Sequence, residues 1–182
     1  MKRIRGFTMI ELLIVIAVIG ILAVAVLSAI NPLEQINRGR DTGLRSDSEQ
    51  ILGAVERFYT IQQYYPWQIK VNDPVDDVIA WTALPDATDG TTTVLAKLSQ
   101  TGTEEIKKSF SERLTRAEYK LFIYKASGTE NSTYVCFSPR SASFQTEAAA
   151  KCAAILPSDW PTSACNNPGT DCGTKKNCVC LP

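Results

Sequence analysis

The stretch Gly6-Phe7-Thr8-Met9-Ile10-Glu11-Leu12-Leu13 and the apolar run that follows it decide how this chain is organised. Leu12 to Ile30 comprises 19 residues, of which only Gly20 and Ser28 are not apolar. At about 1.5 Å per residue, a helix of this length spans roughly 30 Å, the thickness of a bilayer's hydrocarbon core. A core helix of a globular domain would normally show a polar face, which is missing here. The run therefore predicts a membrane-spanning helix.

The basic residues Lys2, Arg3 and Arg5 precede this helix, so two kinds of export segment fit it. In the first, an ordinary secretory signal is removed after the small residues 23–25. In the second, the apolar segment stays on the protein. Glu11 favours the second, because a carboxylate inside an apolar span is costly and an ordinary signal has no use for it. In an isolated subunit we expect this carboxylate to have no stabilising role, which points to a partner.

With its short basic leader, the stretch resembles the N-terminus of type IV pilins and pseudopilins, whose pattern is Gly, Phe, then Thr-Leu-Ile-Glu-Leu. Only Met9 departs from the commonest form, and conservatively. The resemblance implies that a prepilin peptidase cuts between Gly6 and Phe7 and N-methylates Phe7. Gly6 suits a tight protease cleft because it has no side chain. The resemblance also implies that Glu11 faces the N-terminus of a neighbouring subunit during filament assembly.

The orientation in the membrane does not follow from charge alone. Arg38, Arg40 and Arg45 follow the span and match the three bases before it, so the positive-inside rule is undecided. The leader motif and the C-terminal cysteines favour an external C-terminus. We therefore expect a single-pass precursor in the inner membrane, and later an extracellular or periplasmic filament.

The composition excludes several functions. The 182 residues include 19 Lys and Arg, 19 Asp and Glu, and no His. The absence of His removes Ser-His-Asp and Cys-His catalysis and His-ligated zinc. A pI near 6.3 argues against a general nucleic-acid binder. We expect no enzymatic activity, no cofactor and no nucleic-acid partner.

An amphipathic helix is expected over residues 31–63. Apolar residues recur there at three- and four-residue steps, and polar residues are expected to fill the other faces. The apolar set is Leu44, Ile51, Leu52, Val55, Phe58 and Tyr59, and the polar set is Arg40, Asp41, Asp47, Glu49, Glu56 and Arg57. At Pro32 either a kink or a helix end followed by a new helix is expected, and the lack of a Gly-rich linker favours the kink. Tyr65-Pro66 should end the helix.

The remainder of the chain predicts a small head. Residues 67–102 indicate mainly a long loop, with a short helix near 92–100. Thr101 and Glu104 stand at capping-box spacing and predict another helix through Phe110. Alternating residues predict two strands, 118–126 and 132–138, joined by a turn. A helix is expected over 143–154, with Glu147 and Lys151 paired one turn apart.

All cysteines lie in the C-terminal region, which indicates disulfides in an oxidising compartment. They are Cys136, Cys152, Cys165, Cys172, Cys178 and Cys180. Six cysteines allow about 15 pairings. Our first choice joins Cys136 to Cys152 and pairs the other four among themselves. A zinc site is the alternative, but the spacing of the last four is unlike the close Cys pairs of structural zinc sites.

Two further groups of residues have alternative interpretations. An acidic loop within residues 72–90 is either solvated or a calcium site, since some family members bind calcium after the long helix. Its acids are Asp73, Asp76, Asp77, Asp86 and Asp89. Trp67, Trp81 and Trp160 are either core residues or sugar-binding platforms, and the core is the ordinary place for them.

The sequence thus predicts an α+β protein. Residues 1–6 form a cleaved leader, 7–30 a transmembrane and filament-core helix, 31–63 an amphipathic helix, and 64–182 a small antiparallel-β head with a Cys-rich tail at 157–182. The expected function is that of a structural subunit of a type IV pilus-like filament. Its expected partners are copies of itself, minor pilins, the prepilin peptidase, an inner-membrane assembly platform, and the lipid bilayer before assembly. The alternatives are a pseudopilin of a type II secretion system and a membrane-anchored or secreted binding domain.

Overall fold

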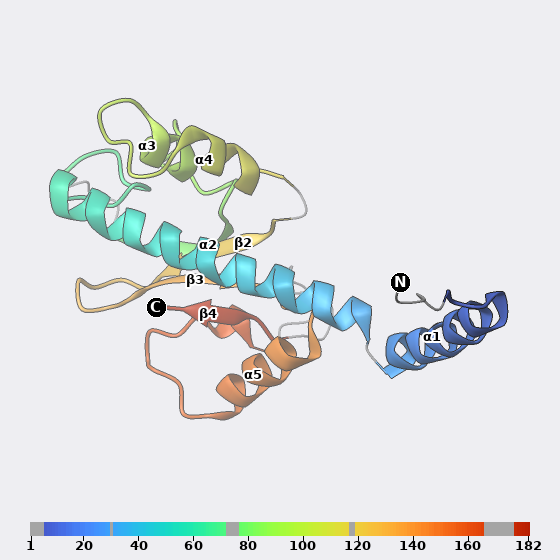
Figure 1. The fold of residues 1–182 in the computed structure, drawn as a ribbon. Helices are drawn as coiled ribbons and strands as arrows, with labels where there is room; N and C mark the ends of the chain where they lie inside the picture. Colours follow the sequence, from blue (N-terminus) through green and yellow to red (C-terminus); the bar gives the residue numbers. More distant parts are fainter. Residues whose placement is uncertain (1–5, 30, 72–76, 117–118, 166–176) are drawn as a thin grey trace. The chain divides into compact units, whose positions relative to one another are not determined.

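The computed structural model describes residues 6–29, 31–71, 77–116, 119–165 and 177–182. The chain divides into two compact units, residues 1–36 and 37–182. The first contains α1, and the second is the head, which contains most of α2 and the remaining elements (Figure 1). The α+β class predicted from the sequence is confirmed.

Helix α1 spans Met9–Ala29 and is apolar on every side. Its described side chains are all exposed, and its large apolar ones range from 45% to 91% exposure. The helix contains residues 12–29 of the predicted apolar run, preceded by Met9, Ile10 and Glu11.

At Pro32 the structure shows a helix end followed by a new helix. Helix α1 ends at Ala29, and α2 spans Pro32–Gln62. The Asn31 side-chain Oδ1 accepts a hydrogen bond from the Glu34 backbone N–H at 3.3 Å, so Asn31 caps the new helix. Pro32 is then the first helical residue, where its missing N–H costs nothing.

The amphipathic pattern of α2 is confirmed on its apolar side. Leu44, Ile51, Leu52, Val55 and Phe58 are buried in the main core of the head. These buried side chains recur at three- and four-residue steps, so one side of α2 packs against the core.

Two acids expected on the solvent faces of α2 are instead buried, so that expectation was wrong. Asp41 accepts hydrogen bonds from the backbone N–H groups of Arg140 and Ser141 and from the Ser141 hydroxyl, and so ties α2 to the start of α5. Asp47 accepts one from Arg113 at 2.9 Å. Each carboxylate has a donor on another segment, which makes its burial tolerable.

The head contains a four-stranded antiparallel sheet in the order β1-β2-β3-β4. The predicted hairpin is confirmed as β2 (Leu121–Lys125) and β3 (Thr133–Phe137). The sequence missed both outer strands. Strand β1 (Ile79–Ala83) lies in the expected long loop, and β4 (Val179–Leu181) lies in the Cys-rich tail. Both are short and gain their hydrogen bonds from the central hairpin.

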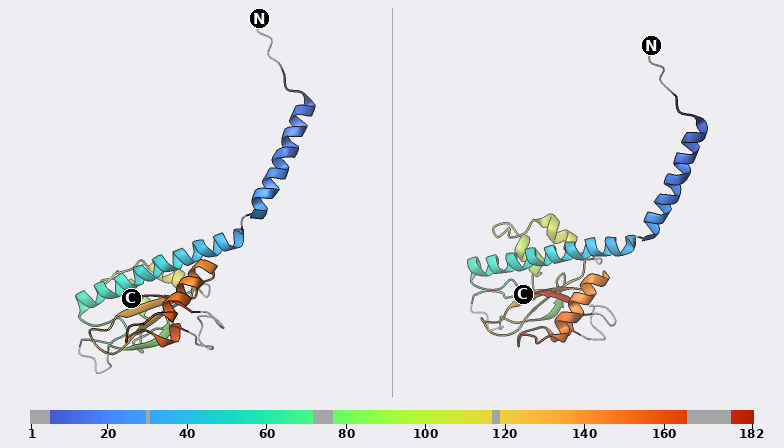
Figure 2. Two further views of the ribbon diagram at one scale, coloured as in Figure 1. Left: turned by 90° about the horizontal axis from the view of Figure 1, so that it is seen from below. Right: turned by 60° about the horizontal axis from the view of Figure 1, so that its bottom comes forward.

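The sheet is covered on both faces. Leu121 and Ile123 point into the main core with α2, which lies along the sheet in Figure 1 and in the two views of Figure 2. Their neighbours Phe122 and Tyr124 join a second apolar cluster, which also holds Trp160 of the C-terminal segment. The strict alternation along β2 places successive side chains on opposite faces.

The short helices partly follow the predictions. Helix α3 spans Val94–Ser99, and the Thr93 hydroxyl caps it. The capping box at Thr101 and Glu104 was wrong: Thr101 lies in a turn, and Glu104 has a positive φ of 41° and does not belong to a helix. Helix α4 begins later and spans Lys108–Leu114.

Helix α5 spans Ala142–Ala153, close to its predicted bounds, and a short 3-10 helix follows at Thr162–Ala164. Glu147 and Lys151, which were expected to pair with each other, each contact a residue outside the helix. Glu147 forms an ion pair with Arg45 of α2. The Lys151 ammonium lies 5.4 Å from the centre of the Trp160 ring.

Candidate assembly segment and disulfide-bridged head

Thr8 and Glu11 form a reciprocal capping box at the start of α1. The Glu11 carboxylate oxygen Oε2 accepts hydrogen bonds from the Thr8 backbone N–H at 2.8 Å and from the Thr8 hydroxyl at 2.6 Å. The Glu11 backbone N–H donates to the Thr8 hydroxyl oxygen at 3.3 Å. This arrangement satisfies N–H groups that would otherwise lack partners at the helix start.

The capping box corrects the expectation that Glu11 has no stabilising role in an isolated subunit. Its carboxylate holds the first turn of α1 together, beside any role it has between subunits. Thr8 was not predicted as a functional residue. The signal that identifies it is the spacing Thr8-x-x-Glu11 immediately before an apolar run.

The predicted cleavage position lies in an exposed, non-helical segment. Gly6 has no atom within 4 Å of the position that a Cβ would occupy, and the Phe7 side chain is 81% exposed. Residues 6–8 precede the first helical residue, Met9. A protease could therefore bind this backbone in an extended form without unwinding α1. The leader residues Lys2, Arg3 and Arg5 lie outside the described residues.

The surface of α1 is suited to a bilayer. Met9–Ser28 is long and apolar enough to span a membrane, and none of it is buried within the chain. An all-round apolar helix in water would expose its whole surface at a large free-energy cost. A bilayer would remove that cost.

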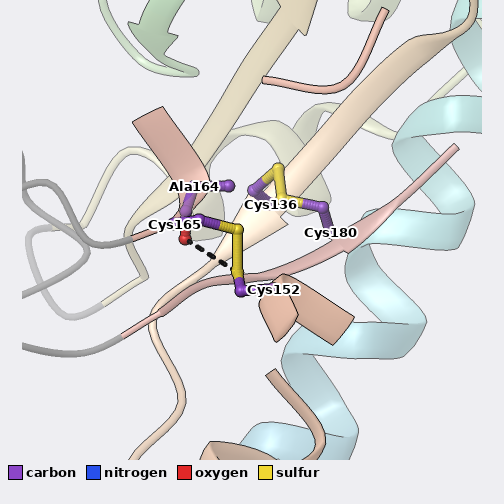
Figure 3. Close-up of a disulfide and its surroundings, with 5 residues drawn as sticks. All are labelled: Cys136, Cys152, Ala164, Cys165 and Cys180. Atoms are coloured by element: carbon purple, nitrogen blue, oxygen red, sulfur yellow. Dashed lines mark hydrogen bonds between the residues drawn. A yellow bond between two sulfur atoms is a disulfide. The ribbon is translucent and has the colours of Figure 1, made fainter. Parts of the chain in front are cut away.

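Two disulfides join segments of the head (Figure 3). Cys136 of β3 is bonded to Cys180 of β4, and Cys152 at the end of α5 is bonded to Cys165. The predicted pairing of Cys136 with Cys152 was wrong. Strand β4 pairs with β3 in a register that places Cys180 directly opposite Cys136, with the Cα atoms 4.0 Å apart.

The structure describes one of the two remaining cysteines. Cys178 is also disulfide-bonded, and Cys172 lies outside the described residues. The cysteines of the two described bridges have no thiolate to offer to zinc, because the thiolate is the form that binds the metal.

The acidic loop is described at three of its five acids, and two of these bind protein donors. Asp77 accepts hydrogen bonds from the Lys125 ammonium at 2.7 Å and from the Gly128 N–H at 3.1 Å. Asp89 accepts from the Lys97 ammonium and from the N–H groups of residues 91 and 92. Burial opposes ionisation of both carboxyl groups, but these donors prevail and lower the pKa of each. Asp73 and Asp76 lie outside the described residues.

The three tryptophans are packing residues. Trp67 and Trp160 are buried, in the main and second clusters respectively. Trp81 stacks on Phe122 with the ring centres 5.1 Å apart. The core interpretation therefore holds for all three, and they do not form exposed platforms.

Comparison with known proteins identifies the N-terminal segment. Residues 1–27 match the family model described as the prokaryotic N-terminal methylation motif, which is the signature of type IV pilins and pseudopilins. With α1, this motif fits a membrane-anchored precursor of pilin-like or pseudopilin type. No curated protein and no solved structure matched the chain.

Proposed function

We propose that this chain is the precursor of a structural subunit of a type IV pilus-like filament. The observation that carries the proposal is that most of α1 lies inside the segment that matches the methylation motif, and that none of Met9–Ser28 is buried. Before assembly the bilayer would cover α1. In the fibre the α1 helices of other copies would replace the lipid, so the same apolar surface serves as anchor and as filament core.

Glu11 would set the register of assembly. After cleavage between Gly6 and Phe7, the α-amino group of Phe7 is a cation close to the membrane. The carboxylate of Glu11 on an adjacent copy would be its counter-charge, and in a low-dielectric setting such attraction is strong. The inner-membrane assembly platform and minor pilins would be the further partners of this step.

In this proposal the head has no catalytic role and decorates the outside of the fibre. The absence of His from the whole sequence supports this, since the commonest general base is missing. The two disulfides and the double-sided core suit a head that must stay folded outside the cell.

Two alternatives make different predictions. A pseudopilin of a type II secretion system would carry the same motif and anchor but form only short periplasmic fibres. Filament length in cells that overproduce the chain separates these two. A membrane-anchored or secreted binding domain would form no fibre at all.

The deciding experiment is mass spectrometry of the mature N-terminus. We expect the mature chain to lack its first six residues and to begin at an N-methylated Phe7. Gly6→Leu should leave uncut precursor in the membrane. Gly20→Leu is a matched control, because both glycines have open space where a side chain would lie. A mature terminus near Val26 would show ordinary signal-peptide cleavage and contradict the proposal.

A further inference from the structure

A groove with an aromatic wall and a polar rim lies at the C-terminal end of α2. It has a volume of about 400 Å³ and belongs entirely to the head. Its lining comes from α2, the loop after it, the start of β3 and the segment after β4, namely Glu56, Tyr59, Thr60, Tyr65, Asn131, Ser132, Thr133 and Pro182. This volume is at the lower end of the range for small-molecule sites, about 300–1,000 Å³.

The aromatic wall is the end of a stack of three rings. Tyr59 and Tyr65 stack with their centres 4.5 Å apart and their planes at 22°, and Tyr65 stacks on Trp67 at 4.7 Å and 7°. Trp67 is buried, while both tyrosines are half-buried. Tyr65 has a ring on each face. Among the described residues, Tyr59 has a ring neighbour on one face only, so it ends the stack at the groove.

A hydrogen bond and a buried ammonium group fix the Trp67 and Tyr65 rings of the stack in place. The Trp67 indole N–H donates to the Asp77 carbonyl oxygen at 3.0 Å. The Lys125 ammonium lies 5.2 Å from the centre of the Tyr65 ring, is fully buried, and donates to the Asp77 carboxylate at 2.7 Å. The ring of Tyr59 is therefore preorganised. A ligand that packs on it loses less conformational entropy on binding.

The rim supplies hydrogen-bonding groups without a cationic side chain. Glu56 provides an exposed carboxylate, and Asn131 and Thr133 provide an amide and a hydroxyl. The Tyr65 hydroxyl is protonated at neutral pH like that of any tyrosine, and burial, with Tyr59, Asp77 and Glu56 nearby, raises its pKa further, to about 12. None of the described residues that line the groove is Lys or Arg, and an anionic ligand would meet Glu56 without a counter-charge.

We propose that this groove binds a neutral saccharide of one or two hexose units. The apolar C–H face of a pyranose ring packs on an aromatic face, while its hydroxyls pair with carboxylate, amide and hydroxyl groups at the edge. Tyr59 and the rim present these two features side by side. The site belongs to the head and does not depend on whether the chain polymerises.

Ligand-observed saturation-transfer NMR on the purified full chain tests the proposal. The detergent must contain no sugar, so lauryldimethylamine oxide is used. The probes are diacetylchitobiose, cellobiose, lactose and maltose at up to about 20 mM, enough to detect the millimolar dissociation constants expected of one stacked ring and a few hydrogen bonds. Choline chloride is the probe for a cation bound by the rings instead.

We expect saturable binding of at least one saccharide, with transfer strongest to the C–H protons of one ring face. Tyr59→Leu should weaken it about tenfold or more, because the aromatic contact is lost, whereas Tyr59→Phe should stay within about threefold. Glu56→Ala should also weaken binding, and this exposed position should not affect folding. Phe110→Leu is the control at another groove of the head.

Three outcomes would overturn the proposal. They are no saturable binding of any saccharide, binding of choline alone, or a saccharide affinity unchanged in both Tyr59→Leu and Glu56→Ala. Circular dichroism of each variant shows whether the head is folded. If Tyr59→Leu does not fold, the comparison of Glu56→Ala with the parent chain decides.

Discussion

Helices α1 and α2 follow one another in the chain but differ in what covers them. Helix α1 has 21 residues, and its described side chains are all exposed, whereas α2 has 31 residues, nine of which are buried in the head. The buried apolar residues of α2 form one stripe that packs against the core of the head. The apolar residues of α1 surround the whole helix. The width of the apolar surface thus distinguishes a helix that packs on the head from one whose described side chains are all exposed.

The largest effect is expected at Glu11, the charged residue in the first turn of α1. Glu11→Leu should leave membrane insertion and folding of the head intact but sharply reduce or abolish incorporation into filaments, because the counter-charge for Phe7 is lost. The measurement is the yield of sheared filaments relative to membrane-bound subunit. Assembly of Glu11→Leu at normal yield would contradict the pairing mechanism.

Two companion variants separate the charge of Glu11 from its capping role. Glu11→Gln keeps an oxygen that can accept the hydrogen bonds of Thr8 but removes the charge, so it should assemble as poorly as Glu11→Leu. Thr8→Ala removes the capping hydroxyl but keeps the carboxylate, and it should still form filaments. The opposite ranking would assign the role of Glu11 to the capping box.

The next largest effect is expected on the free energy of unfolding, when an isoleucine of the α2 core and an isoleucine of α1 are each replaced by Ala. Ile51 is fully buried, whereas Ile16 is 61% exposed. Ile51→Ala should lower the free energy of unfolding of the head by about 2–5 kcal/mol through lost burial and a cavity. Ile16→Ala should not change it measurably. Denaturant unfolding followed by tryptophan fluorescence in detergent gives both values, and equal losses would show that the two helices do not differ as described.

The bridge between β3 and β4 should contribute somewhat less. Replacing both Cys136 and Cys180 by Ser should destabilise the head by about 2–4 kcal/mol, mainly because the unfolded chain regains freedom across a separation of 44 residues. Replacing Cys152 and Cys165, which are 13 residues apart, should cost less. Calorimetry of the two double variants ranks them, and a larger loss for the shorter separation would contradict the loop-entropy explanation.

The smallest effect is expected when the pH is lowered, which should reduce the free energy of unfolding of the head. The pKa values of Asp77, Asp89 and Asp159 are lowered in the folded head: burial opposes this, but hydrogen bonds from nearby donors prevail. A lowered folded-state pKa adds stability that is complete above the unfolded value, about 3.9, and is lost as the pH falls through the folded values. Stability should therefore be insensitive to these groups between pH 5 and 7 and fall below about pH 4. Asp77→Asn should flatten that fall, as measured by unfolding at several pH values.

Local patterns were sufficient for several elements. The apolar run predicted α1 because no charged residue interrupts it, and the alternation of residues 119–124 predicted the central hairpin. Glu11 stood out because a carboxylate at that place is costly. In each case the physical cause acts over a few neighbouring residues and can be read without knowing the fold.

The sequence by itself determined the export motif, the apolar anchor, the central hairpin and the oxidising chemistry of the cysteines. Only the tertiary structure decided which cysteines pair, because the register of β4 against β3 brings Cys180 opposite Cys136. It also decided that Asp41 is buried, since its four hydrogen bonds come from a segment about a hundred residues away. Strand β4 has only three residues, and β1, although as long as β2 and β3, does not alternate between buried and exposed residues. These features depend on contacts between distant segments, which exist only once the chain has folded.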